Sequence, residues 1–132
     1  MSLKIPSFFR YQFPALIWAV MIFIASSIPA SRLPKFAHYV NDKIIHLSIF
    51  FILGLLVYRA LYTMIPGLSF NMKRGVFAVV IVVLYGISDE FHQGFVPGRT
   101  VDVMDATADA AGGLLSVLIV YAVSLLSTKS QA

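Results

Sequence analysis

Four apolar runs divide the chain, and loops containing charged residues, Pro or Gly separate them. A helix needs about 20 mostly apolar residues to cross a bilayer, where each backbone polar group must be satisfied within the protein. We expect helices over about residues 13–28, 44–65, 75–95 and 101–126. The pattern therefore predicts an all-α polytopic membrane protein, a single domain over residues 1–132 that forms a bundle of four transmembrane helices.

The third run, which begins at Gly75, is too short to cross a membrane by itself. Polar residues interrupt it before it reaches the roughly 20 apolar residues that a span needs. A full span requires the helix to continue into these polar residues. Asp89, His92 and Gln93 then share one helical face at the membrane edge, and Glu90 is turned about 100° away. Ionised groups at that depth are costly unless they are paired, hydrated or ligated, so they predict a polar interior or a cavity.

Composition supports a membrane protein, with 59% hydrophobic residues, 12% charged residues and a mean hydropathy of +0.86. A soluble core built from 132 residues cannot hide that much apolar surface, so the expected partner is the lipid bilayer. Cysteine is absent, which excludes disulfides, thiol nucleophiles and thiolate metal sites. The formal net charge of +4 comes without a basic stripe, so we expect no nucleic-acid partner.

Basic residues set the expected orientation of the chain. Lys4 and Arg10 before an apolar run also fit a secretory signal peptide, but we expect this run to be a retained transmembrane helix. The side that holds the termini and the second loop carries Lys4, Arg10, Arg59, Lys73, Arg74 and Lys129, against Arg32, Lys35, Lys43 and Arg99 on the other side. This bias predicts a multi-pass protein of the cell membrane with both termini cytoplasmic.

Acidic residues gather on the side opposite the termini. They are Asp42, Asp89, Glu90, Asp102, Asp105 and Asp109, and they comprise every Asp and Glu of the chain. We expect Thr100 to cap the fourth helix, where the last three acids form one stripe at i, i+3 and i+7. His46 lies one turn after the acid that begins the second helix. The acidic faces of three helices are therefore expected to meet at one depth.

Two further features predict structure and no chemistry. Ala108, Gly112 and Ser116 are spaced by four residues, which permits close helix packing in lipid. Arg59 near the end of the second run is expected to extend its charge to the cytoplasmic interface.

Two segments of the sequence resemble the VanZ family, which is named for a protein associated with resistance to the glycopeptide antibiotic teicoplanin. The matching segments are DKIIHLSIFFILGLL at 42–56 and YGISDEFHQGFVPGRTVDVMDATADAAGGL at 85–114. The resemblance implies a cell-envelope context and a polar site made of Asp42, Lys43, His46, Asp89, Glu90, His92, Gln93, Arg99, Asp102, Asp105 and Asp109. Phe50 stands where many relatives have Tyr, and Asp109 stands where many have Asn.

The first functional hypothesis is a binding protein. An outward-facing acidic pocket with Arg99 at its rim suits an envelope lipid, a cell-wall precursor or a glycopeptide-type antibiotic, and such binding would contribute to antibiotic resistance. The binding residues would be Lys43, His46, Asp89, Glu90, His92, Gln93, Arg99, Asp102, Asp105 and Asp109.

The second hypothesis is a metal-dependent hydrolase or transferase that acts on a lipid-linked phosphate or sugar. Asp89 and His92 at i and i+3 resemble half of a divalent-metal site in a helical bundle, which Asp102, Asp105 or Asp109 would complete. The catalytic candidates are Asp89, Glu90, His92 and Asp105. Two other hypotheses remain: an internal ion-pair network that locks the helices together, and a proton- or ion-coupled carrier.

Overall fold

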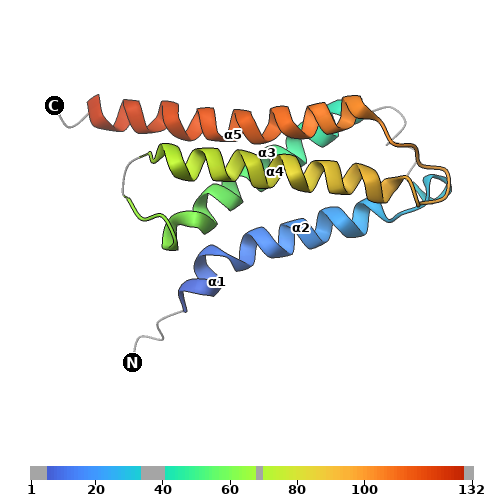
Figure 1. The fold of residues 1–132 in the computed structure, drawn as a ribbon, viewed down its shortest axis with the longest axis horizontal. Coiled ribbons are helices and arrows are strands. Elements are labelled where there is room, and N and C mark those ends of the chain that lie inside the picture. The colour runs from blue at the N-terminus through green and yellow to red at the C-terminus, as the bar shows by residue number, and fades with distance from the viewer. Residues whose placement is uncertain (1–5, 34–40, 68–69, 130–132) are drawn as a thin grey trace.

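The computed structural model describes residues 6–33, 41–67 and 70–129, and within these residues the chain is helical with no strand. Figure 1 shows the long helices as a bundle, with α1 and the C-terminal end of α5 at the same end. The α-helices are α1 (Ser7–Tyr11), α2 (Phe13–Ser26), α3 (Asp42–Ala60), α4 (Met72–Gln93) and α5 (Val103–Lys129). Short 3-10 turns, η1 (Ala30–Arg32) and η3 (Leu61–Thr63), follow α2 and α3.

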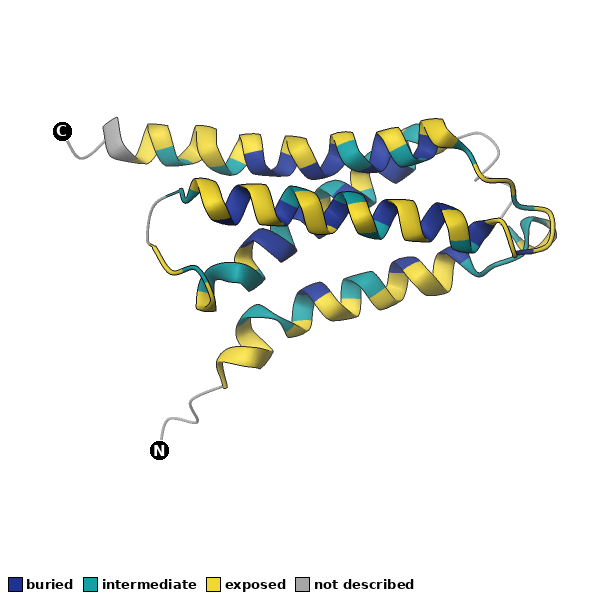
Figure 2. Ribbon diagram, viewed as in Figure 1, coloured by how far each residue is buried: buried dark blue, intermediate teal, exposed yellow. Residues whose placement is uncertain are grey.

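Three helical segments are long and apolar enough to cross a membrane: Asp42–Thr63, Met72–Gln93 and Val103–Ser127. The apolar α2 is shorter, with 14 residues. The predicted all-α bundle of membrane helices is confirmed. Large apolar side chains such as Val20, at 54% exposure, face outward over most of the bundle surface, as the exposed outer faces in Figure 2 show. This surface suits a lipid environment.

A short helix, α1, precedes the first apolar run, and Gln12 separates it from α2. Pro14 explains the break, because its ring lacks an N–H and crowds the carbonyl four residues earlier. The run was expected to remain helical to about residue 28, but α2 ends at Ser26. Trp18 joins α2 to the bundle by donating its indole N–H to the carbonyl of Ile49 at 2.9 Å.

Close packing between α3 and α5 forms the centre of the bundle. A Cβ at Gly112 would collide with the α3 backbone at Leu47 and Phe51, so only glycine permits this approach. Ala108 and Ser116, one turn away on either side, are also buried. The predicted small-residue packing face is therefore confirmed. It fixes the register of α3 against α5 and so positions the polar residues at their N-terminal ends.

Arginines and tyrosines occupy the end of the bundle where α1 lies and α4 begins. Arg74 is 4% exposed, donates from Nη2 to the carbonyl of Gly67 at 2.9 Å, and lies 4.7 Å from the centre of the Tyr58 ring. Exposed Arg59 lies 5.8 Å from the centre of the Tyr11 ring. We call this region the basic end; its described basic residues are Arg10, Arg59, Lys73 and Arg74. Lys4 and Lys35 of the predicted charge bias lie outside the described residues.

Candidate functional site

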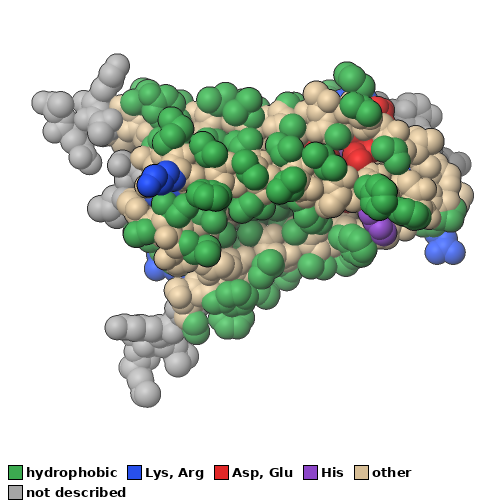
Figure 3. Space-filling model, viewed as in Figure 1, with side chains coloured by type: hydrophobic (Ala, Val, Ile, Leu, Met, Phe, Trp, Pro, Cys, Tyr) green, Lys and Arg blue, Asp and Glu red, His purple; other side chains and the backbone are tan. Residues whose placement is uncertain are grey.

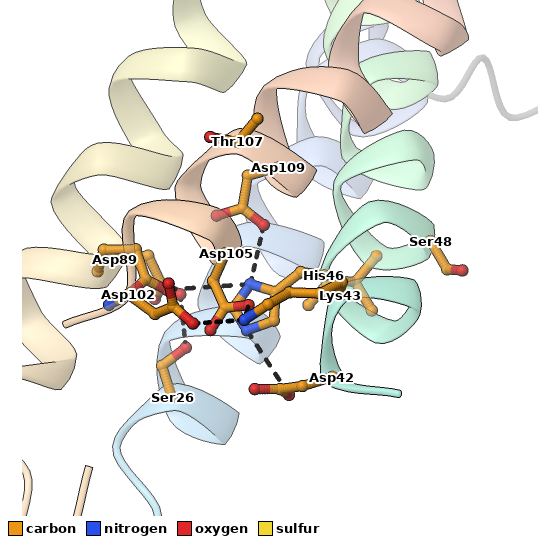
Figure 4. Close-up of polar contacts among 12 residues, drawn as sticks. Ser26, Asp42, Lys43, His46, Ser48, Asp89, Asp102, Asp105, Thr107 and Asp109 are labelled. Atoms are coloured by element: carbon orange, nitrogen blue, oxygen red, sulfur yellow. Dashed lines mark hydrogen bonds and ion pairs between the residues drawn. The ribbon is translucent and has the colours of Figure 1, made fainter. Parts of the chain in front are cut away.

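The acidic residues lie together at the other end of the bundle, where α2 and α4 end and α3 and α5 begin. The acidic groups visible in Figure 3 lie only at this end, among apolar side chains that cover the rest of the face. We call the region the acidic end; its acids are Asp42, Asp89, Glu90, Asp102, Asp105 and Asp109. Figure 4 shows their side chains converging from α3, α4, α5 and the segment before α5. The structure thus brings together residues that are far apart in sequence.

His46 lies in the middle of this cluster. The Asn41 side chain caps α3 by accepting a backbone N–H at 3.0 Å, and this start places His46 in the second turn. The imidazole is 6% exposed, and its Nδ1 forms a 2.9 Å hydrogen bond with Oδ1 of Asp109, which is fully buried. Nδ1 also lies 4.0 Å from Glu90 Oε1, and Nε2 lies 4.0 Å from Asp42 Oδ1. His46 therefore has carboxylates on both ring nitrogens.

The last turns of α4 supply buried polar groups that face two different neighbours. Asp89 and Glu90 are each 3% exposed. Asp89 Oδ2 faces α2, where it accepts from Ser26 Oγ at 2.9 Å, and it also accepts from Gln93 Nε2 at 3.0 Å. Glu90 Oε2 faces the start of α5 and accepts the backbone N–H of Asp102 at 3.0 Å. The expected 100° between the two acids therefore leaves both of them inside the bundle.

Lys43 neutralises part of the acidic end. Its ammonium group donates to Asp102 Oδ2 at 2.5 Å and also to Oδ1 of Asp105, which is buried. The hydrogen bond from Lys43 holds the pKa of the Asp102 carboxyl below its ordinary value, and a backbone N–H bond from Met104 acts in the same direction. Lys43 thus pairs with two carboxylates, one directly before α5 and one in the first turn of α5.

The cap of α5 differs from the one predicted. Thr100 was expected to cap this helix, but α5 begins at Val103, and Asp102 Oδ1 accepts the Met104 N–H at 2.8 Å. Asp102 satisfies this free N–H because its side chain lies directly before the first turn. Asp102 is consequently a cap and a partner of Lys43, and it precedes the helical stripe that continues through Asp105 and Asp109.

Two predicted site residues lie at the edge of the cluster and not at its centre. His92 is half-buried; its Nε2 forms a 2.9 Å hydrogen bond with Ser27 Oγ, and its ring stacks on Phe23 with centroids 4.5 Å apart. Arg99 donates from Nε to the carbonyl of Ile28 at 3.3 Å and has no carboxylate within ion-pair distance among the described residues. Both side chains therefore contact the C-terminal end of α2 and the residues directly after it.

Potential metal ligands form two overlapping groups among the described residues. In each group the ligand atoms lie within 4.8 Å of one another: Asp42, His46 and Asp105 in one, and His46, Glu90 and Asp109 in the other. The predicted pairing of Asp89 with His92 occurs in neither group. The reason is geometric, because Asp89 binds Ser26 and Gln93 whereas His92 turns toward Ser27.

A cavity of about 430 Å³ opens beside the cluster, between α2 and α3. Its polar lining includes Ser26, Asp42, His46, Gln93 and Arg99, and apolar residues such as Ile49 complete the wall. Asp89 lies behind this wall and holds two of the lining side chains, Ser26 and Gln93, by hydrogen bonds. The cavity therefore combines an apolar surface with oriented polar groups.

Comparison with known proteins places this arrangement in a family. The family model VanZ/LLP1 matches residues 11–126, which is nearly the whole chain. The chain belongs to the VanZ/LLP1 family. It is also similar to an uncharacterised protein of Schizosaccharomyces pombe, with 27% identity over 118 residues that cover 89% of this chain and 70% of the relative. No solved structure matches it.

The structure adds residues that the sequence analysis of this VanZ/LLP1 protein did not include in the site. Ser26 binds Asp89, and Ser27 binds His92, so both serines belong to the polar end. The sequence feature that could have indicated these two residues is the pair of adjacent hydroxyl side chains at the end of the first apolar run. Asp42 was on the expected side and matched the family pattern, and it proves to line the cavity.

Proposed function

We propose that this VanZ/LLP1 protein binds the polar head of an envelope amphiphile in the cavity at the acidic end and thereby contributes to antibiotic resistance. The observation that carries this proposal is the cavity itself, whose lining combines Ser26, His46, Gln93 and Arg99 with apolar residues. Binding sites for small molecules have this mixture and volumes of about 300–1,000 Å³. We further propose that the acidic end faces outward across the cell membrane and that both termini are cytoplasmic.

The size and charge of the site narrow the ligand. A cavity of about 430 Å³ holds a lipid head group or one sugar, and it is too small for an entire glycopeptide. Asp42 at the wall and the acids behind it favour a head that carries hydroxyl or amine donors. A relative in a yeast favours an envelope lipid over a ligand restricted to bacterial cell walls. A lipid-linked precursor or a glycopeptide would place only its polar head or a single sugar here.

Trp18 provides the test, because it is the only tryptophan of the chain and bonds the carbonyl of Ile49, a cavity residue. Its fluorescence should change saturably when lipid nanodiscs containing the protein are titrated with an alkyl glucosaminide. An alkyl glucoside with the same tail should bind more weakly, because it lacks the amine. Asp89→Asn should weaken binding by about 1 to 3 kcal/mol, the range for a lost charge-assisted hydrogen bond.

Asp102→Asn is the matched control, because the side chain of this acid lies at the same end but neither lines the cavity nor bonds a lining side chain, whereas Asp89 bonds Ser26 and Gln93. Affinity should remain within about twofold of wild type in this variant. An equal loss in Asp89→Asn and Asp102→Asn would assign the effect to general charge and would contradict a specific cavity site. The absence of any saturable change with envelope lipids or amino sugars would also contradict it.

A second candidate function is a metal-dependent hydrolase or transferase acting on a lipid-linked phosphate or sugar. The observation that favours it is the compact group of His46, Glu90 and Asp109 beside the cavity. A metal held there would supply a Lewis acid and an activated water. Under this hypothesis a chelator and His46→Gln should each reduce release of phosphate or sugar by orders of magnitude. Graded loss of binding without any turnover would retain only the first function.

A further inference from the structure

The buried carboxyl groups of the acidic end exceed the cations that contact them. Asp89, Glu90 and Asp109 are at most 3% exposed, and we call them the inner acids. Lys43 is engaged with two of the three acids outside this set, Asp102 and Asp105, and Arg99 binds a backbone carbonyl. Among the described residues, no Lys or Arg nitrogen lies within 4.0 Å of an inner acid. In the described part of the chain, the imidazole of His46 is the one basic group within 4.0 Å of an inner acid, and it reaches Glu90 and Asp109.

This imbalance has a large energetic consequence at a membrane site. Removing an ionised carboxylate from water costs several kcal/mol even after the surroundings relax, unless a positive charge and hydrogen bonds replace the lost hydration. The hydrogen bonds are incomplete, because Asp89 Oδ1 and Asp109 Oδ2 are buried and lack a partner among the described residues. Asp109 is directed from α5 into the cluster, as Figure 4 shows. A cation of charge +2 bound to Asp109 would balance the excess negative charge and would place a positive charge beside the carboxylate whose Oδ2 lacks a partner.

We propose that His46, Glu90 and Asp109 bind one divalent transition-metal ion. Metal–ligand bonds of about 2.0–2.2 Å place neighbouring ligand atoms about 3 to 3.5 Å apart. The separation from His46 Nδ1 is 2.9 Å to Asp109 Oδ1 and 4.0 Å to Glu90 Oε1, and all three atoms lie within 4.8 Å of one another. Small side-chain rotations therefore suffice to form the site.

The surrounding hydrogen bonds hold these ligands in position. Glu90 is fixed through Oε2 by the backbone N–H of Asp102 and through Oε1 by Gln93 Nε2 at 3.3 Å. On the far side of the imidazole, Nε2 of His46 faces Asp42 Oδ1 at 4.0 Å. A carboxylate behind the imidazole is the usual orienting partner of a metal-binding histidine.

The ligand atoms indicate the class of ion. One imidazole nitrogen with two carboxylates suits Mn²⁺, Fe²⁺ or Zn²⁺, whereas Ca²⁺ and Mg²⁺ prefer oxygen ligands alone. The neighbouring group of Asp42, His46 and Asp105 is a weaker candidate. Lys43 already bonds Asp105, and the side chain of Asp42 is 57% exposed. An ion there would have to displace an ammonium group.

The metal site extends beyond the proposed ligand binding, since an ion can bind without an amphiphile. The test uses the full chain purified in detergent, stripped with a chelator, desalted and titrated with Mn²⁺ while electron paramagnetic resonance measures the free ion. Wild type should bind one equivalent, and Zn²⁺ should compete. Asp109→Asn and Glu90→Gln should each weaken Mn²⁺ binding at least tenfold, with circular dichroism and size-exclusion chromatography to verify folding.

Lys73→Gln should leave Mn²⁺ affinity unchanged, because this exposed residue lies at the basic end, away from the ligand set. If Asp109→Asn does not fold, Glu90→Gln decides the result. Folded wild-type protein that binds neither Mn²⁺ nor Zn²⁺ would overturn the metal site, and so would equal loss in Lys73→Gln. Loss in Asp42→Asn with full binding in Glu90→Gln would overturn this ligand set. The Trp18 titration in chelator tests amphiphile binding separately.

Discussion

The two ends of the bundle handle charge in opposite ways. At the basic end, Arg59 is exposed over the Tyr11 ring, and buried Arg74 lies over the Tyr58 ring and bonds a carbonyl. No acid is involved, because every Asp and Glu of the chain lies at the acidic end. At that end, His46 and Asp109 depend on each other inside the protein. Charges at the basic end are stabilised one by one, by an aromatic ring, a backbone carbonyl or solvent, whereas those at the acidic end are coupled to one another.

This difference shows which end is able to perform chemistry. A guanidinium over an aromatic ring is stabilised by the ring and by water, so its neighbours need no special arrangement. Buried carboxylates are tolerated only when several groups are positioned together, and such arrangements are enriched at functional sites. The acidic end is therefore the candidate site, and we expect the basic end to act as an anchor at the membrane surface. Four measurements at the two ends can break or sharpen this contrast.

The largest expected effect is a difference in cysteine accessibility, because the two ends are expected to face opposite sides of the membrane. The chain has no cysteine, so Pro97→Cys at the acidic end and Met64→Cys at the basic end each introduce a unique label. Both positions are exposed. An impermeant maleimide should label the first in intact cells and the second only after the membrane is opened. The reverse pattern would invert the proposed orientation.

Removing one partner of the buried pair should give the next largest effect. His46→Ala leaves Asp109 without its hydrogen-bond partner in the interior and should lower the free energy of unfolding by about 3 to 5 kcal/mol. Arg59→Ala at the basic end should change it by no more than about 0.5 kcal/mol. Detergent unfolding followed by circular dichroism measures both. Equal effects would contradict the contrast between coupled and individually stabilised charges.

Substitution of a close-packed glycine should have a smaller effect that is specific to the acidic end. A Cβ at Gly86 would lie 2.9 Å from Asp109 Cβ, so Gly86→Ala should push α4 from α5 and cost about 1 to 3 kcal/mol. Gly67→Ala near the basic end meets no atom closer than 3.5 Å, although its φ of 155° adds backbone strain. Only the first change should also alter Mn²⁺ affinity. Altered Mn²⁺ affinity in Gly67→Ala would show that the ends are coupled.

The smallest expected effect is the response to acid. Because Lys43 lowers the pKa of Asp102 in the folded protein, their bond contributes stability above the ordinary carboxyl pKa of about 4. This contribution is lost as the pH falls through the lower folded pKa. Asp102→Asn should therefore flatten the pH dependence of the unfolding midpoint below pH of about 4. Lys73→Gln at the basic end should not change it, and an equal flattening there would contradict the assignment.

The sequence predicted the bundle well because the membrane imposes strong rules on helix length and apolarity. It also predicted that the acids would meet, since Asp89, Asp105 and His46 had to lie near the same depth. The direction of each side chain was harder to predict. His92 shares a helical face with Asp89, yet it turns to Ser27 on α2. Helical periodicity specifies the angle around one helix, and the position of neighbouring helices decides what each angle faces.

Glu90 and the start of α5 also show that helical periodicity alone does not predict what a side chain faces. Glu90 was predicted to point away from the Asp89 face, and that direction is where α5 and His46 lie. The Thr100 cap was wrong because Asp102 bonds the first free N–H while also reaching Lys43. Both results depend on the loop between α4 and α5, whose path the apolar pattern does not specify. The conformation of this loop includes Gly98 at a φ of 76°.

Because few residues of α2 are buried, this helix is the wall of the site that moves most easily. This helix buries only Ala15, Ile22 and Ser26 among its described residues, whereas α3 and α5 meet backbone to backbone at Gly112. His46 and Asp109 belong to the closely packed helices α3 and α5, whereas Ser26 belongs to α2 and bonds Asp89 of α4. Outward tilting of α2 would break this bond and widen the cavity without moving His46 or Asp109. A tilt of this kind would let the proposed site accommodate heads of different bulk around the same His46 and Asp109.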